Sequence, residues 1–479
     1  MYASFGLYVD GEWRQARGGA QLDVIDPATE EVLGAIPSAA PADLDDALAA
    51  AARGLAVWRR TSPWDRAKVL RRAADLIRER VEAIVAVMSA ETGKPLAEAR
   101  LETGAAADQF EWYAEETKRI YGQTIEGRDP AVRMTVHYEP VGIVAAFSPW
   151  NFPAVLPARK LAAALGAGCA VVIKPAEEAP GSGMAIMQAL HDAGLPKGVA
   201  NLVTGVPASI ASHLIAAPMV RKISFTGSVP VGKQLLRLAA DGVKKVSMEL
   251  GGHCPVLVFE DADPVAAAEA AGRAKFRNCG QVCVSPSRFF VHESIAEPFA
   301  DAFARLARSL KLGPGREAGV EMGPLANKRG LTRALELVED ARQAGARLRA
   351  GGGRPSGFNR GYFFEPTVLD QVPDSARIMH EEPFVPIAPI VAFSSFDEAV
   401  AKANAVPFGL AAYVFTRSLK TATLASEALE AGMVGVNDMA LATAEAPFGG
   451  VKESGIGREG GSLGIKDYLE AKYTRFRLV

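Results

Sequence analysis

Cysteine is the side chain in this sequence whose setting most directly suggests covalent chemistry. Cys283 stands in the segment Gly280-Gln281-Val282-Cys283, beside polar groups rather than inside an apolar stripe. A thiolate attacks carbonyl carbons well, and a flanking turn with free backbone N–H groups could hold the resulting oxyanion. The alternative is that Cys283, like Cys169, Cys254 and Cys279, is an inert core residue with a free thiol.

Two further polar side chains stand where predicted strands end. Asn151, in Pro149-Trp150-Asn151-Phe152-Pro153, could donate its amide to a developing oxyanion, while the prolines hold the loop in one shape. Glu249, directly before Leu250-Gly251-Gly252, could act as a general base. The other interpretations are a turn asparagine bonded to its own backbone and a surface glutamate in a salt bridge.

A phosphate-binding turn is suggested by Gly227-Ser228-Val229-Pro230-Val231-Gly232, which follows a strand and opens a helix. Val229 stands where the usual dinucleotide pattern has its second glycine, so an ordinary strand-to-helix turn fits as well. Lys174 and Glu177 stand at the end of another predicted strand, 170–174, and a carboxylate in such a place can bind the hydroxyls of an adenosine ribose. The same carboxylate would repel a 2′-phosphate, which favours NAD over NADP. The alternative is a solvated loop charge.

Strand ends and loops are needed to position these residues, and the hydrophobic pattern of the sequence predicts both. The first third is predicted to be helical, over 43–60, 66–90 and 94–121, followed by a polar segment with an exposed strand at 135–138 that could pair with a partner chain. Strands then alternate with helices: strands at 141–147, 170–174, 199–204, 221–225 and 244–250, helices at 154–166, 183–193, 209–217 and 231–240. A second alternating series runs from about 261 to 435, with strands at 288–291, 363–368 and 411–415. Two α/β domains with parallel, doubly wound sheets are therefore predicted, with a ligand cleft between them.

Composition narrows the class of protein. The 479 residues include 53 Lys or Arg and 55 Asp or Glu, a net charge of −2 that argues against nucleic acid as a partner. At 49% hydrophobic and 23% charged residues, disorder is not expected. The longest uncharged stretch, 141–158, contains three prolines and will not span a membrane, and no secretory signal is visible, so a cytoplasmic location is predicted. The cysteines and histidines form no metal-binding pattern, so no metal is expected.

The ordered motifs together resemble the NAD(P)-dependent aldehyde dehydrogenase superfamily, from about residue 7 to 473. They are PWNFP at 149–153, KPAE at 174–177, FTGS at 225–228, ELGG at 249–252, GQVC at 280–283, EEPF at 381–384 and PFGGVKESGIGRE at 447–459. The resemblance implies an α/β fold of the aldehyde dehydrogenase type, with two doubly wound parallel-sheet domains and a small β extension for oligomerisation. It implies a dinucleotide-binding domain at 1–121 and 141–251, a catalytic domain at 252–448, and oligomerisation segments at 122–140 and 466–479.

The resemblance also assigns roles. Cys283 is expected to be the nucleophile, Asn151 and the Cys283 backbone N–H the oxyanion site, and Glu249 the base that activates water for thioester hydrolysis. Lys160 and Glu459 match positions linked to proton relay around that base. The residues expected to bind NAD, with NADP possible, are Trp150, Lys174, Glu177, Gly227, Ser228, Gly251, Glu382 and Phe384. Because a free thiol has a pKa of about 8.5, Cys283 needs a lowered pKa or a neighbour that takes its proton.

Two arginines suggest an anionic substrate. Arg159 and Arg277 match positions that bind the substrate carboxylate in succinate semialdehyde dehydrogenases, and two guanidinium groups suit a carboxylate. Thr443 is the hydroxyl that remains where those enzymes usually have two serines, since Ala442 replaces the other. Ser285 replaces a cysteine found in some of them, which excludes a disulfide between that position and the nucleophile.

The predicted function is therefore oxidation of a small carboxylate-bearing aldehyde, succinate semialdehyde above others, to the acid through a thiohemiacetal and a thioester. A homo-oligomer, dimer or tetramer, is expected from the family. Two alternative functions remain: a 2-oxoglutarate semialdehyde dehydrogenase and a broad-specificity aliphatic aldehyde dehydrogenase. The alternative interpretation of the two arginines is that they form surface salt bridges. A non-catalytic NAD-binding structural protein is the alternative from a different class.

Overall fold

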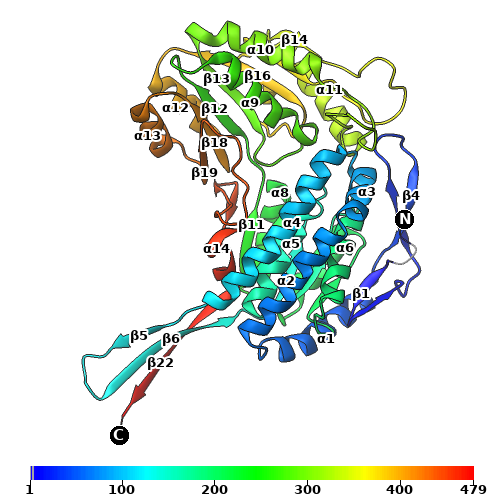
Figure 1. The fold of residues 1–479 in the computed structure, drawn as a ribbon, viewed down its shortest axis with the longest axis vertical. Coiled ribbons are helices and arrows are strands. Elements are labelled where there is room, and N and C mark those ends of the chain that lie inside the picture. The colour runs from blue at the N-terminus through cyan, green and yellow to red at the C-terminus, as the bar shows by residue number, and fades with distance from the viewer. Residues whose placement is uncertain (1, 3–4, 479) are drawn as a thin grey trace.

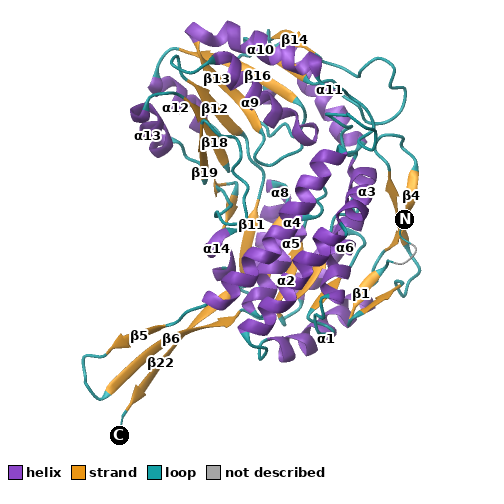
Figure 2. Cartoon of the chain, viewed as in Figure 1, coloured by secondary structure: helices purple, strands orange, loops and turns teal. Residues whose placement is uncertain are grey.

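The computed structural model describes residue 2 and residues 5–478, which form two α/β units and a projecting β arm (Figure 1 and Figure 2). The predicted fold class, two parallel-sheet units with a small β extension, is confirmed. Within the described residues no helix is both long and apolar enough to cross a membrane.

The first unit is built on a sheet whose neighbouring strands β9, β8, β7, β10 and β11 are parallel. Its spatial order is β2 (Glu12–Arg14), β1 (Leu7–Val9), β9 (Ala200–Leu202), β8 (Ala170–Lys174), β7 (Ile143–Phe147), β10 (Val220–Thr226), β11 (Lys245–Glu249) and β21 (Gly455–Ile456). Its helices are α1 (Pro41–Trp58), α2 (Pro63–Glu79), α3 (Val81–Thr92), α4 (Leu96–Glu116), α5 (Val155–Ala167), α6 (Pro180–Asp192), α7 (Pro207–Ala216) and α8 (Val229–Ala240).

The alternation of side chains along a strand explains why helices cover both faces of this sheet. In β7, Val144 and Ala146 pack into the core formed with α2 to α6, whereas Ile143 and Ala145 pack into the core formed with α1, α7 and α8. A strand that is apolar on both sides needs cover on both sides, which is the doubly wound arrangement.

The second unit has the sheet order β14 (Arg347–Ala350), β15 (Thr367–Asp370), β16 (Ile387–Phe393), β13 (Pro286–His292), β12 (Cys254–Val258), β18 (Ala411–Phe415) and β19 (Met433–Val436). Its helices are α9 (Pro264–Phe276), α10 (Ala296–Ser309), α11 (Lys328–Gln343), α12 (Phe396–Asn404) and α13 (Leu419–Ala428). The smaller elements are β3 (Gln21–Ile25) paired with β4 (Val32–Pro37), β17 (Phe408–Gly409) paired with β20 (Val451–Lys452), and α14 (Gly461–Lys466). The domain boundaries given above stay predictions.

The arm is a sheet of order β22 (Leu469–Arg477), β6 (Val132–Pro140) and β5 (Gln123–Glu126), and it projects from the first unit (Figure 1). The strand predicted at 135–138 lies inside β6, and its expected role as an unpaired edge is wrong, because β22 and β5 of the same chain pair with both of its sides. The edges of the arm are β5 and β22.

Two other expectations differ from the structure, and one group of strands was not predicted. The helix predicted over 66–90 is two helices, because the backbone of Arg80, at φ −104° and ψ 15°, ends α2 and begins α3. The strand predicted at 363–368 begins only at Thr367, since Phe363 and Phe364 are buried as irregular chain. The N-terminal strands β1 to β4 were not predicted, because they have only three to six residues each.

Candidate active site

A cavity of about 570 Å³ lies at the carboxyl ends of β7, β10 and β11 and is lined by residues of both units. Carboxyl ends of parallel strands meet at one edge of a sheet, which is why residues far apart in the sequence gather here. The predicted site residues in its lining are Trp150, Asn151, Gly227, Ser228, Glu249, Gly251, Cys283, Glu382 and Phe384.

The loop that presents Cys283 is held by an unusual backbone. Asn278, Cys279 and Gly280 have φ values of 47°, 54° and 72°, in the left-handed region. A Cβ at Gly280 would collide with the carbonyl of Val385, so the close approach of the Val385 backbone also requires glycine here. This turn places the half-buried Cys283 against the cavity.

Burial raises the pKa of Cys283 to about 12, and the charge of Arg159 opposes this rise. Of the two possibilities left by the sequence, a lowered pKa or loss of the proton to a neighbour, this arrangement supports the second. Glu249 and Glu382 are the carboxyl groups whose charges act on the thiol.

Asn151 lies against the same loop. Its side-chain Nδ2 donates to the carbonyl oxygen of Gln281 at 3.0 Å, and its own backbone oxygen accepts from Asn278 Nδ2 at 3.0 Å and from Lys94 Nζ at 2.9 Å. An amide has two N–H donors, so the second hydrogen of Asn151 is available to an oxyanion on a substrate bound to Cys283.

Glu249 is almost fully buried, with 2% of its surface exposed, and neither carboxylate oxygen has a partner within the described residues. Burial is the main cause that raises its pKa well above the usual range, and the charge of Glu459 adds to the rise. Lys160 and Arg159 oppose it. A carboxylate with a raised pKa and free lone pairs suits a general base that works near neutral pH.

The structure brings Lys160 and Glu459 together beside that base. Lys160 Nζ lies 2.6 Å from Glu459 Oε1 and also donates to Thr226 Oγ1 at 2.7 Å. Both side chains are buried, and their pair lies close enough for each charge to act on Glu249. The relay role remains a prediction.

The cofactor residues fall into two groups. Gly227 and Ser228 stand at the start of α8, where the first backbone N–H groups of a helix lack helical partners. Lys174 Nζ pairs with Glu177 Oε2 at 2.6 Å after β8 and lies outside the lining of the cavity.

The other group lies near Cys283. Glu382 accepts a hydrogen bond from the Gly252 N–H at 3.1 Å, and a Cβ at Gly251 would collide with its carboxylate, so the glycines make room for this acid. Burial raises the pKa of Glu382 to about 7. Phe384 has a φ of 52° and meets Trp150 edge to face, with 5.7 Å between ring centroids. Left-handed backbone at a bulky residue stores strain, which is typical of functional sites.

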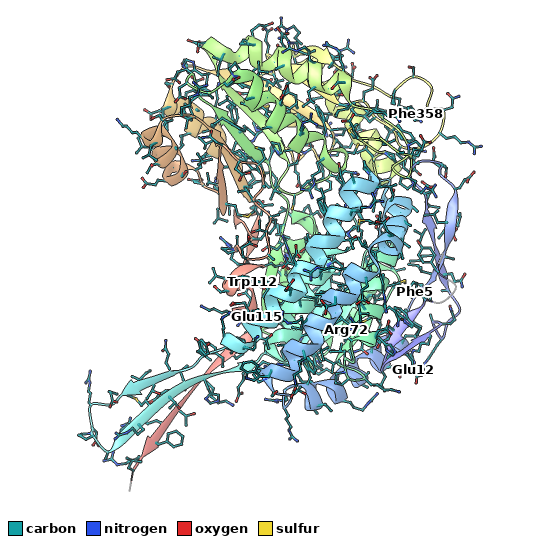
Figure 3. The ribbon with its side chains drawn as sticks, viewed as in Figure 1. Phe5, Glu12, Arg72, Trp112, Glu115 and Phe358 are labelled. Atoms are coloured by element: carbon teal, nitrogen blue, oxygen red, sulfur yellow. The ribbon has the colours of Figure 1, made fainter. Side chains whose placement is uncertain are left out.

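Arg159 and Thr443 line a neighbouring hollow of about 470 Å³. Trp112 and Glu115 of α4, labelled in Figure 3, line it as well. The guanidinium of Arg159 lies 4.3 Å from the centre of the Phe448 ring, and Phe448 lines the cavity that holds Cys283. Arg159 therefore connects the hollow to the catalytic cavity.

Arg277 is placed differently. It is exposed, its guanidinium lies 5.3 Å from the centre of the Phe152 ring, and it lines neither the cavity nor the hollow. Of the two predicted arginines, only Arg159 therefore lines the hollow beside the cavity.

Comparison with known proteins agrees with this geometry. The model of the aldehyde dehydrogenase family matches residues 13–474. The chain belongs to the aldehyde dehydrogenase family.

Among relatives of this aldehyde dehydrogenase, 3-sulfolactaldehyde dehydrogenase of Pseudomonas putida is 47% identical over 97% of this chain and 96% of its own. Succinate-semialdehyde dehydrogenase [NADP(+)] GabD of Escherichia coli is 43% identical over 97% and 96%. The crystal structure of succinate-semialdehyde dehydrogenase from Burkholderia pseudomallei has a TM-score of 0.97 at 44% identity, covering 99% of this chain and 98% of that one. The predicted family and the oxidoreductase class are confirmed.

Aldehyde dehydrogenases use NAD or NADP, and the residues present here fit such a dinucleotide. The N-terminus of α8 offers anion-binding N–H groups, and the carboxylates of Glu177 and Glu382 are acceptors of the kind that ribose hydroxyls need. The glycine at 251 keeps the space beside Glu382 open.

Several residues of this aldehyde dehydrogenase were missed by sequence reasoning. Arg333 donates to the carbonyl oxygens of Glu382 and Pro383, at 2.6 and 3.3 Å, and lines the cavity. Lys94 and Glu102 form a buried ion pair behind Asn151. Lys94 follows Gly93, which ends a helix, and this helix break in Glu91-Thr92-Gly93-Lys94-Pro95 is the signal that could have drawn attention to it.

Proposed function

We propose that this aldehyde dehydrogenase oxidises a small aldehyde that carries an anionic group at its far end, with succinate semialdehyde as the reference substrate. The observation that supports this proposal is the environment of Arg159. This arginine is 4% exposed, and its Nε is buried without a hydrogen-bond partner within the described residues. A buried guanidinium without a partner is costly, and a substrate anion in the adjoining hollow would supply that partner.

The reaction follows from the positions of three side chains. The Cys283 thiol gives its proton to a neighbouring base, its sulfur attacks the aldehyde carbon, and the oxygen that becomes negative is stabilised by the free N–H of Asn151 and by backbone N–H groups. Bound NAD supplies the two-electron acceptor. Oxidation leaves an acyl group on Cys283 as a thioester, and Glu249 takes a proton from the water that hydrolyses it, so the product is a free carboxylic acid.

A sulfonated aldehyde is the second candidate. The relative at 47% identity is named for 3-sulfolactaldehyde, and a sulfonate carries the same single negative charge with three acceptor oxygens. Arg159 and the hydroxyl of Thr443 suit either anion. A panel of semialdehydes of different chain length, 2-oxoglutarate semialdehyde, a sulfonated aldehyde and neutral aliphatic aldehydes distinguishes these substrates.

The test of the anion receptor is Arg159→Ala. We expect kcat/KM for succinate semialdehyde to fall by about 10²–10³-fold and that for butanal to stay within about threefold, since only the anionic substrate loses a charge-assisted bond. Arg159 also acts on the pKa of Cys283, but this effect falls on both aldehydes equally, so the ratio of the two kcat/KM values is the measurement.

Arg277→Ala is the matched control. Because Arg277 is exposed and outside the cavity lining, its removal should change the ratio by less than about tenfold. Equal losses on both aldehydes in the Arg159 variant would contradict the anion receptor. If no aldehyde at all supported NADH formation by the native protein, the non-catalytic alternative would be correct.

We also propose that NAD is preferred to NADP. Glu177, held by Lys174 at 2.6 Å, is a third exposed and can reach a ribose, where its charge would repel a 2′-phosphate. Glu177→Ser should therefore raise the ratio of kcat/KM for NADP to that for NAD by about tenfold or more. Glu178→Ser, which changes the adjacent acid, serves as the control. A native enzyme that prefers NADP, as the name of the Escherichia coli relative implies for that protein, would contradict this proposal.

A homo-oligomer, dimer or tetramer, is proposed to form through the arm. Its apolar side chains are unusually exposed for a strand, with 55% for Tyr473 and 53% for Phe476. The edges of β5 and β22 also have unpaired backbone groups that suit a second copy.

A further inference from the structure

A buried ion pair lies directly behind the loop that presents Asn151. Lys94 and Glu102 are each 1% exposed, and Lys94 Nζ is paired with Glu102 Oε2. Lys94 stands between α3 and α4, and Glu102 lies in the second turn of α4. Neither residue lines the catalytic cavity.

Both members of the pair hold the same stretch of backbone. Lys94 Nζ donates to the backbone oxygen of Asn151 at 2.9 Å and lies 4.2 Å from the centre of the Phe152 ring. Glu102 Oε1 accepts from the N–H groups of Ala154 and Val155, at 2.8 and 3.3 Å, at the start of α5. The peptide groups on either side of the turn are therefore fixed by charge-assisted hydrogen bonds.

The oxygen that Lys94 binds is also where the two units of the protein meet. It accepts a second hydrogen bond, from Asn278 Nδ2 at 3.0 Å, and Asn278 belongs to the strained turn that leads to Cys283. Because a side chain leaves its backbone in a direction set by the adjoining peptide planes, fixing this carbonyl fixes the direction of the Asn151 amide.

Stability alone does not account for such a pair. Replacing a buried ion pair by apolar side chains is often neutral for stability or favourable, so two charges buried at this point call for another explanation. Displacing an oxyanion donor by about 1 Å can cost two orders of magnitude in rate, which makes its backbone support functionally important.

We propose that Lys94, paired with Glu102, is a positioning residue that orients the Asn151 amide toward the oxyanion formed on Cys283. This inference rests on the role proposed above for Asn151. Lys94 does not touch the substrate, and it acts through the Asn151 carbonyl.

The test compares two reactions of Cys283 in the Lys94→Met variant. Aldehyde oxidation passes through an oxyanion, whereas alkylation of the thiol by iodoacetamide does not. We expect kcat for aldehyde oxidation to fall by about 10²-fold, while the rate of alkylation and the KM for NAD stay within about threefold. Lys222→Met is the matched control: Lys222 is also a fully buried lysine, bonded to Ser247 at 2.5 Å, and its loss should leave kcat within about threefold.

The double variant Lys94→Met/Glu102→Gln separates positioning from folding. Removing both charges should return Tm toward the native value, because no unpaired charge stays buried, but kcat should remain low. If kcat recovered together with Tm, or if Lys94→Met kept native kcat, the inference would be overturned. Asn151→Ala completes the set: native kcat in that variant would refute the proposed oxyanion site itself, whereas a low kcat there with native kcat in Lys94→Met would refute only the role of Lys94.

Discussion

Replacing Cys283 by alanine is expected to lower kcat for aldehyde oxidation by about 10⁴-fold or more, while the affinity for NAD stays within about threefold. The alanine keeps the backbone N–H groups and the strained turn, and it removes only the atom that bonds to the aldehyde carbon. The measurement is steady-state NADH formation together with NAD binding by fluorescence titration.

Cys254→Ala is the matched control for this prediction. Cys254 is buried, and its Sγ lies 3.6 Å from the backbone oxygen of Cys283, so it is the neighbouring thiol but does not line the cavity. Burial raises the pKa of Cys254 to about 12, as it does that of Cys283, so the two thiols differ in their access to the cavity rather than in pKa. We expect this variant to keep kcat within about threefold. If turnover survived the loss of Cys283 and disappeared with the loss of Cys254, the nucleophile would be Cys254, and its assignment to Cys283 would be wrong.

Replacing Glu249 by glutamine is expected to lower steady-state kcat by about 10³-fold and to leave a first burst of NADH with an amplitude near one per chain. The thioester can form without this base, but its hydrolysis cannot proceed at a useful rate. Rapid mixing of the variant with NAD and succinate semialdehyde, followed by NADH absorbance, measures both phases. Loss of the burst amplitude would contradict the assignment of Glu249 to the hydrolysis step.

The pH dependence of the native enzyme follows from the same carboxyl group. Burial and the charge of Glu459 raise the pKa of Glu249 well above its usual range, so the base form is lost at a higher pH than for an ordinary carboxylate. When hydrolysis limits turnover, kcat should therefore decrease as the pH falls through this raised pKa, and this acid limb should be missing in Glu249→Gln. Glu381→Gln is the control, since Glu381 also lines the cavity but is paired with Arg377 at 3.0 Å and should keep the acid limb.

The sequence predicted those parts of the site that depend on a strand end. Asn151, Glu249 and Gly227 lie at or just after the ends of strands of five to seven residues, and the strand at 143–147, before Asn151, is visible in the sequence as a buried apolar run. Family resemblance then added Glu382 and Phe384, whose loop carries no local chemical signal. The roles of all these residues stay predictions until they are tested.

Contacts between distant segments could not be predicted in this way. Lys94 binds a backbone oxygen 57 residues away, and a backbone acceptor leaves no mark in the sequence. Arg159 and Arg277 stand at similar sequence distances from the predicted catalytic residues, yet only Arg159 lines the hollow beside the cavity, whereas Arg277, at the C-cap of α9, is exposed. The break at Arg80 was missed for a related reason: the apolar periodicity continues across it into α3.

The account depends on an acyl group attached to the sulfur of Cys283. The most direct measurement is mass spectrometry of the Glu249→Gln variant, quenched in acid during the NADH burst and digested with a protease. We predict one acyl group per chain, of the mass given by the aldehyde used, on the peptide that contains Cys283. An NADH burst with that peptide unmodified, or with the acyl group on another cysteine, would contradict the account.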